Sequence, residues 1–437
     1  MVHKLRNHRA FFIPLLLMVI SVLFTGCGRE DNLDWQGRKE IILATFRSDK
    51  LASELVSQFN RTNKEYYITI DVYWDGVCDD EGQMARKKFD ATITNRRASR
   101  YPDIVLTTAN HSYFRYAKRG AFIDLMPYLE ADEELSREDL FEQVLDTLLV
   151  DEKQYGLPAS FTMQALVMNK TAAASDRSLE TISDFQKNAD YSISALWDRV
   201  HNIHFWMLQY LDEFIDWQAG VCDFDDPRFI SLLEMFDVIP EEYDVYKLLD
   251  AIRDNEPLFL NWEIRNIYDL EEFHYLFGGD MTITGLPGRE EEINVYFSNI
   301  FSITRNSRNK QIAWDFISMS VSDKFQTGKM DRQDFHLTIS RNVLEEFLLQ
   351  HSEEKAWPII RTTYIDNYVR YHICYLTQDT INSFLRLLDM KMTAVVYDYR
   401  LMDIILEEVN GYLGGQPLER TITNLNDRVG LYLKENR

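Results

Sequence analysis

Cysteine is scarce in this chain, which has four cysteines in 437 residues. Cys78, Cys222 and Cys374 are widely spaced, and Cys27 belongs to a separate motif described below. Three such residues cannot form the disulfide framework of a small secreted domain. We expect three buried thiols, with one disulfide among them as the alternative.

Positive charge is also in short supply. The chain has 47 Lys and Arg against 70 Asp and Glu, a formal charge of −23. The first 26 residues hold Lys4, Arg6 and Arg9 and no acid, so the rest carries about −26 (−23 minus 3). A body this acidic repels nucleic-acid phosphates and anionic lipid headgroups. The composition therefore excludes nucleic-acid binding.

Catalytic and cofactor motifs are absent from the sequence. It contains no G-x-S-x-G, H-E-x-x-H, G-x-G-x-x-G, G-x-x-x-x-G-K-[ST] or C-x-x-C. His201 and His204 have a spacing that can bind a metal, but only scattered acids such as Asp198 stand nearby. We expect no metal, no cofactor and no enzyme activity. A glycosidase that uses a carboxylate pair is the alternative, since pairs among 70 acids are uninformative.

The N-terminus has the pattern of an export signal. The basic segment is followed by an apolar stretch, Phe11 to Phe24, which is too short for the roughly twenty residues of a membrane-spanning helix. Leu23 to Cys27 (LFTGC) then resembles a bacterial lipobox, although Phe24 stands where Leu is usual. We therefore predict a signal peptide over 1–26, a lipid on Cys27 and a flexible tether over 27–39; an ordinary signal peptide is the alternative.

The globular part begins with alternating strand and helix patterns. Apolar runs predict strands at Ile41–Thr45, Tyr67–Trp74 and Pro102–Leu106, and helical spacing predicts helices at Lys50–Asn60 and Met84–Asn95. Alternation at this spacing is typical of a mainly parallel sheet covered by helices. The fold class is therefore α/β.

The rest of the chain predicts a second α/β unit and a helix-rich C-terminal part. An acidic helical stretch over Glu130–Leu149 precedes it. The predicted strands are Ala165–Lys170, Leu258–Leu260 and Met281–Pro287, and the predicted helices are Ala195–Trp217, Arg228–Met235, Ile312–Val321, Arg341–His351, Thr377–Leu388 and a long terminal region broken at Gly414-Gly415.

Ordered sequence blocks resemble the extracellular solute-binding proteins that feed ABC importers, in particular the group often specific for sugars and oligosaccharides. The blocks are Tyr101–Val105, Tyr116–Leu125, Tyr155–Pro158 with Met168–Lys170, Cys222–Phe229, Ala313–Ile317 and Glu407–Leu433. Each is weak alone, but six in the right order span nearly all of 40–437. Met168 departs from the family pattern, in which Tyr is common.

The resemblance implies a two-lobed, periplasmic-binding-protein-like fold with a hinge. It places the first lobe at 40–160 plus 297–340 and the second at 161–296 plus 341–437, with the ligand in the cleft between them. It also implies sugar capture, delivery to ABC permease subunits, and a monomer. With the lipid, we expect a protein anchored to the outer face of the cell membrane, typical of a Gram-positive bacterium.

Sugars present apolar C–H faces and hydroxyl rims, so a sugar site needs flat aromatics and carboxylates or amides. Candidates at predicted strand ends and at the hinge are Arg47, Trp74, Asp75, Asn110, Tyr113, Phe161, Trp262, Glu263, Phe297 and Ser298. Trp262 is the first choice because it follows a predicted strand in a polar context. A core position is the alternative for Trp262, Trp74 and Phe161.

Overall fold

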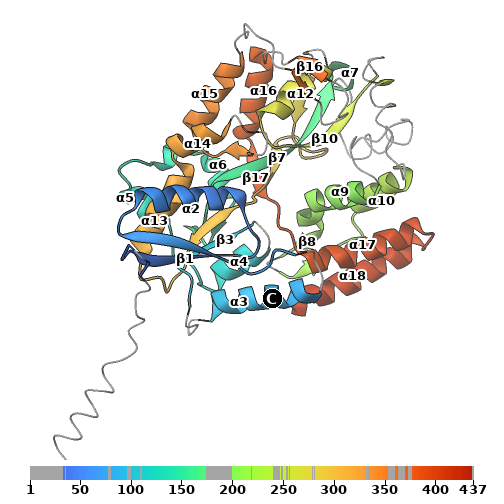
Figure 1. Cartoon of the computed structure of the whole chain (residues 1–437). Helices are drawn as coiled ribbons and strands as arrows, with labels where there is room; N and C mark the ends of the chain where they lie inside the picture. The colour runs from blue at the N-terminus through green and yellow to red at the C-terminus, as the bar shows by residue number, and fades with distance from the viewer. Residues whose placement is uncertain are drawn as a thin grey trace, which may run out of the picture.

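The computed structural model, drawn in Figure 1, describes most of the chain beyond the predicted leader. The described residues are 33–34, 36–76, 80–95, 100–108, 111–173, 199–217, 219–239, 247, 250–251, 254, 256–277, 279, 281–330, 332, 335–352, 360–362, 370–372 and 376–435. Cys27, Cys78, Cys374 and Asn110 lie outside them. Within these residues no helix combines the length and the apolar character needed to span a bilayer.

The first sheet contains five strands in the order β2-β1-β3-β13-β6. Its strands are β1 (Lys39–Thr45), β2 (Tyr66–Val72), β3 (Ile104–Thr107), β6 (Leu157–Pro158) and β13 (Ile300–Ile303). β1 pairs in parallel with β2 and β3, whereas β13 is antiparallel to β3 and β6. The sheet is therefore parallel where the βαβ pattern predicted it and mixed at its other edge.

Helices connect and cover this sheet. They are α2 (Lys50–Thr62), α3 (Asp80–Thr94), α4 (His111–Lys118), α13 (Lys310–Val321) and α14 (Asp323–Met330). Asp49 begins α2 by accepting from the backbone N–H of Ala52 at 2.7 Å. After α4 the chain turns at Gly120, whose φ of 65° suits glycine.

The second sheet is built around the long strand β7 (Ser160–Asn169). Its path is β10-β7-β12-β17, and β11 and β14 also pair with β7. These strands are β10 (Phe259–Ile264), β11 (Met281–Thr284), β12 (Glu292–Tyr296), β14 (Leu337–Thr338) and β17 (Lys391–Ala394). The chain passes from the first sheet to the second at Ala159, between β6 and β7, and returns between Tyr296 and Ile300.

The two faces of β7 pack against different cores because successive side chains of a strand point to opposite sides. Ala165 and Val167 belong to a core shared with the first sheet, and Leu166 and Met168 belong to a second core. The first is covered by helices that include α12 (Ile267–Leu276), α15 (Arg341–Ser352) and α16 (Gln378–Leu388). The second is covered by α9 (Arg199–Phe214), α10 (Pro227–Val238), α17 (Tyr399–Leu413) and α18 (Leu418–Glu435).

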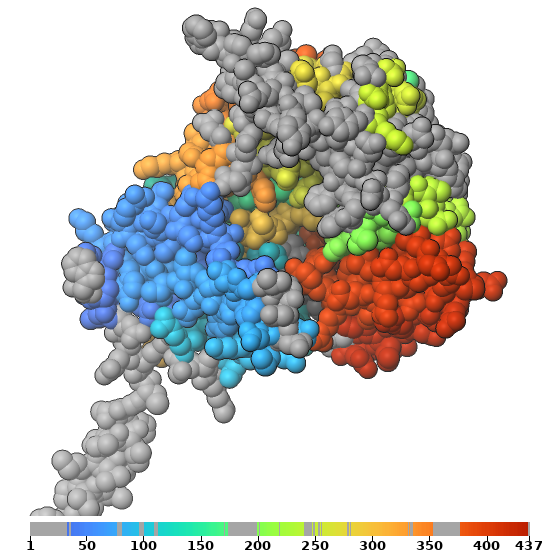
Figure 2. Space-filling model, turned by 45° about the vertical axis from the view of Figure 1, so that its right-hand side comes forward, coloured from blue at the N-terminus to red at the C-terminus, as the bar shows by residue number. Residues whose placement is uncertain are grey.

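The C-terminal helices α17 and α18 form a hairpin that lies beside α9 and α10 (Figure 1). The hairpin also approaches α3 of the first sheet's layer in this view. Figure 2 shows the surface hollowed between the blue N-terminal region and the red hairpin. Segments from both ends of the chain therefore border one hollow.

Three sequence predictions of local structure were wrong. Glu130–Leu149 is not one helical stretch but consists of α5 (Met126–Ala131), a 3-10 turn at Arg137–Asp139, α6 (Glu142–Asp146) and the start of β4 (Leu149–Val150). The strand predicted at Leu258–Leu260 continues to Ile264, since the alternation of apolar Trp262 and Ile264 with polar neighbours fits a strand. The terminal region contains β17, which is too short for periodicity to reveal.

The remaining elements are short and peripheral. They are β5 (Lys153–Gln154), α7 (Lys170–Ala173), β8 (Ile215–Asp216), β9 (Val221–Cys222), β15 (Ile360–Thr362) and β16 (Arg370–His372). Cys222 is a free, partly buried thiol that donates to the Asn426 carbonyl at 3.6 Å.

Candidate functional site

The loops after β1 and β2 lie side by side at the carboxyl edge of the first sheet. The Trp74 backbone N–H donates to the Phe46 carbonyl at 2.8 Å, and the Ser48 hydroxyl donates to an Asp75 carboxylate oxygen at 2.6 Å. Parallel strands end at the same edge, where ligands bind in open α/β sheets. The structure thus brings Arg47, which is exposed, together with Trp74 and Asp75.

The Trp74 ring is folded over the backbone of Gly76. A Cβ added to Gly76 would stand 2.6 Å from Cζ2 of the indole, so only glycine permits this ring position. Trp74 is partly buried, and its indole N–H has no acceptor among the residues the structure describes. An aromatic face with an unused donor at a strand end suits a sugar ring.

Phe46 is covered by an arginine that the sequence did not single out. The guanidinium carbon of Arg86, on α3, lies 3.5 Å from the centroid of the Phe46 ring. Phe89 supports Phe46 at 6.0 Å between ring centroids, and Tyr73 packs edge-on against Phe89 at 5.1 Å. Burial lowers the pKa of Arg86. The side chain remains charged at neutral pH because the ordinary pKa of an arginine lies far above that pH.

The second sheet presents a polar surface on the face that meets α9. Glu263 and Asn294 lie opposite Gln164, and Tyr296 lies opposite Thr162, so all five side chains share this face. The Thr162 hydroxyl donates to Glu263 at 2.5 Å, and the Asn294 amide donates to the carbonyl of Gln209 on α9 at 2.8 Å.

Tyr296 stands near the end of this polar surface with its hydroxyl buried. Among the described residues the hydroxyl has no hydrogen-bond partner. Burial raises the pKa of Tyr296, and the negative charges of Glu263 and Asp212 raise it further. The hydroxyl is therefore protonated, and it lies close to two carboxylates without being bonded to either.

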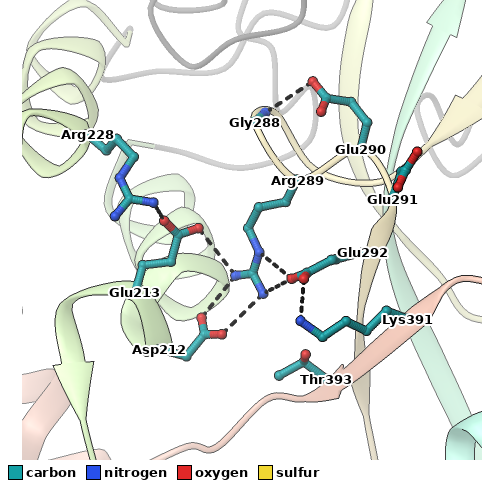
Figure 3. Close-up of a pocket in the computed structure, with 10 residues that line it drawn as sticks. All are labelled: Asp212, Glu213, Arg228, Gly288, Arg289, Glu290, Glu291, Glu292, Lys391 and Thr393. Atoms are coloured by element: carbon teal, nitrogen blue, oxygen red, sulfur yellow. Dashed lines mark hydrogen bonds and ion pairs between the residues drawn. The ribbon is translucent and has the colours of Figure 1, made fainter.

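A charged pocket of about 570 Å³ adjoins this face, between α9, α10, the 285–292 turn and β17 (Figure 3). Arg289 stands at its centre and donates to both oxygens of Asp212 at 3.1 and 3.2 Å and to Glu292 at 2.8 Å. Lys391 also binds Glu292, and Arg228 binds Glu213.

The pocket's charges shift one another's protonation. Burial opposes the charge of Arg289, but Asp212, Glu292 and Glu213 outweigh burial and raise the pKa of Arg289. A hydrogen bond from Lys391 and the charge of Arg289 hold the pKa of Glu292 below its usual value. Five acids and three cations line the pocket, so it keeps acceptor oxygens in excess. Such oxygens suit a ligand rich in hydroxyl donors.

Several predicted site residues lie in the interior. Trp262 is 7% exposed and packs edge-on against Phe273 of α12 at 5.1 Å, on the face of β10 opposite to Glu263. Tyr113 has no exposed surface and donates its hydroxyl to the Leu148 carbonyl at 2.9 Å. Phe161 is equally buried against Phe141. Core packing accounts for these three positions in this structure.

Two predicted residues lie where the chain returns to the first sheet. Phe297 is 5% exposed, whereas Ser298 is exposed and its hydroxyl lies 3.3 Å from Nδ1 of His336. His336 in turn acts electrostatically on Asp49, whose pKa burial raises. This crossover therefore joins the N-terminus of α2 to the segment before β14.

Sequence reasoning missed an aromatic group at the start of α17. Tyr399 is 57% exposed, and Tyr397 packs edge-on against it at 4.2 Å. The His204 ring stacks on Tyr397 at 5.5 Å, which occupies one of the two histidines considered for a metal. No cluster of metal-binding side chains occurs in the described part of the chain. Asp398, which caps α17, could have been found from the sequence, whereas β17 before it is too short for periodicity to reveal.

Comparison with known proteins identifies the fold. No family model and no curated protein matches the sequence. Solved structures do match. The sugar-binding protein MalE from Xanthomonas citri is 14% identical with a TM-score of 0.57, over 91% of this chain and 98% of that one.

Two further matches are of the same kind. An extracellular solute-binding protein of family 1 from Alicyclobacillus acidocaldarius is 12% identical, with a TM-score of 0.58 over 91% and 99% of the two chains. A cyclic alpha-maltosyl-1,6-maltose binding protein from Arthrobacter globiformis is 13% identical, with a TM-score of 0.56 over 92% and 100%. The chain therefore has the two-lobed, periplasmic-binding-protein-like α/β fold, as predicted.

Proposed function

We propose that this protein captures a carbohydrate between two α/β lobes and delivers it to an ABC importer. The observation that carries the proposal is the pairing of two sheets, joined at Ala159 and at 297–299, in a fold shared with sugar-binding proteins over about nine-tenths of the chain. Chains that cross between lobes in this way act as hinges, and closure around a ligand is the motion they permit.

The side chains around the hollow suit a sugar. Trp74 offers an aromatic face from the first sheet, and Tyr399 offers one from α17. Asp75 and Glu263 offer carboxylate oxygens to hydroxyl donors. Two ring stacks and several charge-assisted bonds of about 1 to 2 kcal/mol each make a micromolar Kd reachable. Such a Kd corresponds to a binding free energy of about −8 kcal/mol. That affinity suits capture followed by release.

The lobes that close are those expected from the sequence, 40–160 plus 297–340 and 161–296 plus 341–437. Strands β1, β2, β3, β6 and β13 support the first division, and the β7-centred sheet supports the second. Ligand contacts from the first lobe are Arg47, Trp74, Asp75 and Asn110, and those from the second are Glu263 and its neighbours on the polar face. The protein acts as a monomer.

Membrane anchoring places the capture step beside the importer. A lipid on Cys27 and a tether over 27–39 hold the receptor on the outer face of the membrane that contains the permease subunits. Confinement beside the transporter raises the effective concentration of the loaded receptor. Replacing Cys27 by Ala should abolish incorporation of labelled palmitate and release the protein from the membrane fraction; retention with full labelling would contradict the anchor.

A thermal-shift screen of mono- and oligosaccharides tests the capture itself. A ligand that binds only the folded protein stabilises it by mass action and so raises its Tm. At a ligand concentration of about a hundred times Kd, the free energy of unfolding rises by about 2.7 kcal/mol. We expect one class of carbohydrate to stabilise the mature chain while remaining uncleaved, as checked by chromatography. If none stabilises it and a glycoside is hydrolysed, the carboxylate-pair glycosidase is the better description.

A further inference from the structure

Arg86 is held by an aromatic ring and has no ion-pair partner among the described residues. The guanidinium carbon of Arg86 lies 3.5 Å from the centroid of the Phe46 ring and 6.0 Å from the centroid of the Phe89 ring. Stacking on an aromatic face orients the planar donor fork of an arginine before any ligand arrives. Arg86 is only partly buried, so the group is still open to solvent on one side.

The acid that acts on Arg86 is committed elsewhere. Asp90 binds Arg115 at 2.8 Å and also accepts from the Tyr116 hydroxyl. No ion pair joins Arg86 to an acid within the described residues, although Asp90 acts on it electrostatically. Among the described residues this half-buried guanidinium therefore has no bound carboxylate, although the chain holds 23 more acids than Lys and Arg.

Arg86 also stands where the two lobes face each other. Phe46 directly follows β1 at the carboxyl edge of the first sheet. The Tyr399 hydroxyl, from the exposed start of α17, is among the groups that act on Arg86 electrostatically. The guanidinium therefore lies against an aromatic ring at the edge of the first sheet, within electrostatic range of the tyrosine that begins α17.

We propose that Arg86 is a specificity-determining residue that binds the carboxylate of an acidic sugar, so that the captured carbohydrate contains a uronic acid. The inference rests on the carbohydrate function proposed above and names the ligand's chemical class. The sugar's carboxylate takes the donor fork of Arg86, which stays stacked on Phe46, in the bidentate geometry that guanidinium groups favour.

The acidity of the whole protein does not prevent this selectivity. Charges more than about 8 to 10 Å apart are largely screened at physiological ionic strength, so the distant acids act weakly on a bound carboxylate. The local guanidinium decides the interaction. A neutral sugar leaves Arg86 without a partner in the closed protein, which costs affinity.

The experiment compares charged and uncharged forms of the same sugar. Trisaccharides of galacturonate, glucuronate and mannuronate, each with its methyl ester, and the neutral maltotriose, cellotriose and mannotriose are tested on the mature chain by thermal shift and calorimetry. The variants are Arg86→Gln, which removes the charge, and Arg119→Gln, which removes an exposed charge on α4's end as a matched control.

We expect one uronate trisaccharide to bind about ten- to a hundredfold more tightly than its ester. Arg86→Gln should abolish that difference, and Arg119→Gln should preserve it. Equal binding of acid and ester, or an acid preference that survives Arg86→Gln, would overturn the inference. Binding of neutral trisaccharides alone would also overturn it and leave the carbohydrate function standing. Binding of no carbohydrate would refute the function as well.

Discussion

Trp262 and Glu263 are adjacent in β10 and should respond to substitution in opposite ways. Trp262 points into the core against Phe273, and Glu263 points to the polar face beside Thr162. We expect Trp262→Ala to weaken the fold without removing a ligand contact. We expect Glu263→Gln to keep the fold, because the amide oxygen still accepts from Thr162, and to weaken carbohydrate binding.

The size of the Trp262 effect follows from its burial. The side chain is 7% exposed, so nearly all of the roughly 200 Å² that a tryptophan can bury is removed from water. At about 25 cal/mol per Å² this burial is worth about 5 kcal/mol, an upper estimate because unfolded chains are partly compact. Measured Trp→Ala losses in cores are about 3–5 kcal/mol.

Urea unfolding followed by circular dichroism measures this loss, and calorimetry with the sugar found by screening measures binding. Trp262→Ala should lower the unfolding midpoint strongly and leave the Kd of the folded fraction within about twofold. An unchanged midpoint together with lost binding would refute the core assignment and return Trp262 to the ligand surface.

Other predictions concern stability and pH. Burial alone would raise the pKa of Glu408, but hydrogen bonds from Asn424, Arg428 and Gln416 outweigh it and lower the pKa. The native state then binds fewer protons than the unfolded one, so this stabilisation is present above pH 4.5 and is lost as pH falls below it; acid unfolding of Glu408→Gln should lack that component. Gly156→Ala should cost about 1–3 kcal/mol, since its Cβ would stand 2.4 Å from Ile300, and an unaltered Tm would contradict the packing. Gly328→Ala, in open space on α14, should stabilise by about 0.5–1 kcal/mol in the same melts.

Local patterns predicted most of the regular structure. The helix predicted at Lys50–Asn60 is observed at Lys50–Thr62, and the break at Gly414-Gly415 separates α17 from α18. These succeeded because amphipathic spacing and caps depend on residues a few positions apart. The acidic stretch 130–149 failed because its short segments pack individually against the body, which no periodicity records.

The ligand surface was only partly predictable. Trp74 and Asp75 follow a strand that alternation identifies, so their place at the sheet edge could be inferred. The strand predicted to end at Leu260 ends four residues later, at Ile264, so Trp262 lies within β10, and the side a residue faces depends on where a strand continues. The start of α17 is marked by its cap, Asp398, but its place beside the first sheet's layer (Figure 1) depends on packing that no local pattern records.

The sequence by itself determined the α/β class, the order of the elements, the excess of acid and the expected leader, because each of these is a property of neighbouring residues or of composition. Only the tertiary structure decided which side chains meet. Phe46 and Arg86 are separated by forty positions, and they come together because the end of β1 and helix α3 pack at one edge of the first sheet. Packing between distant segments, rather than any local pattern, creates that site.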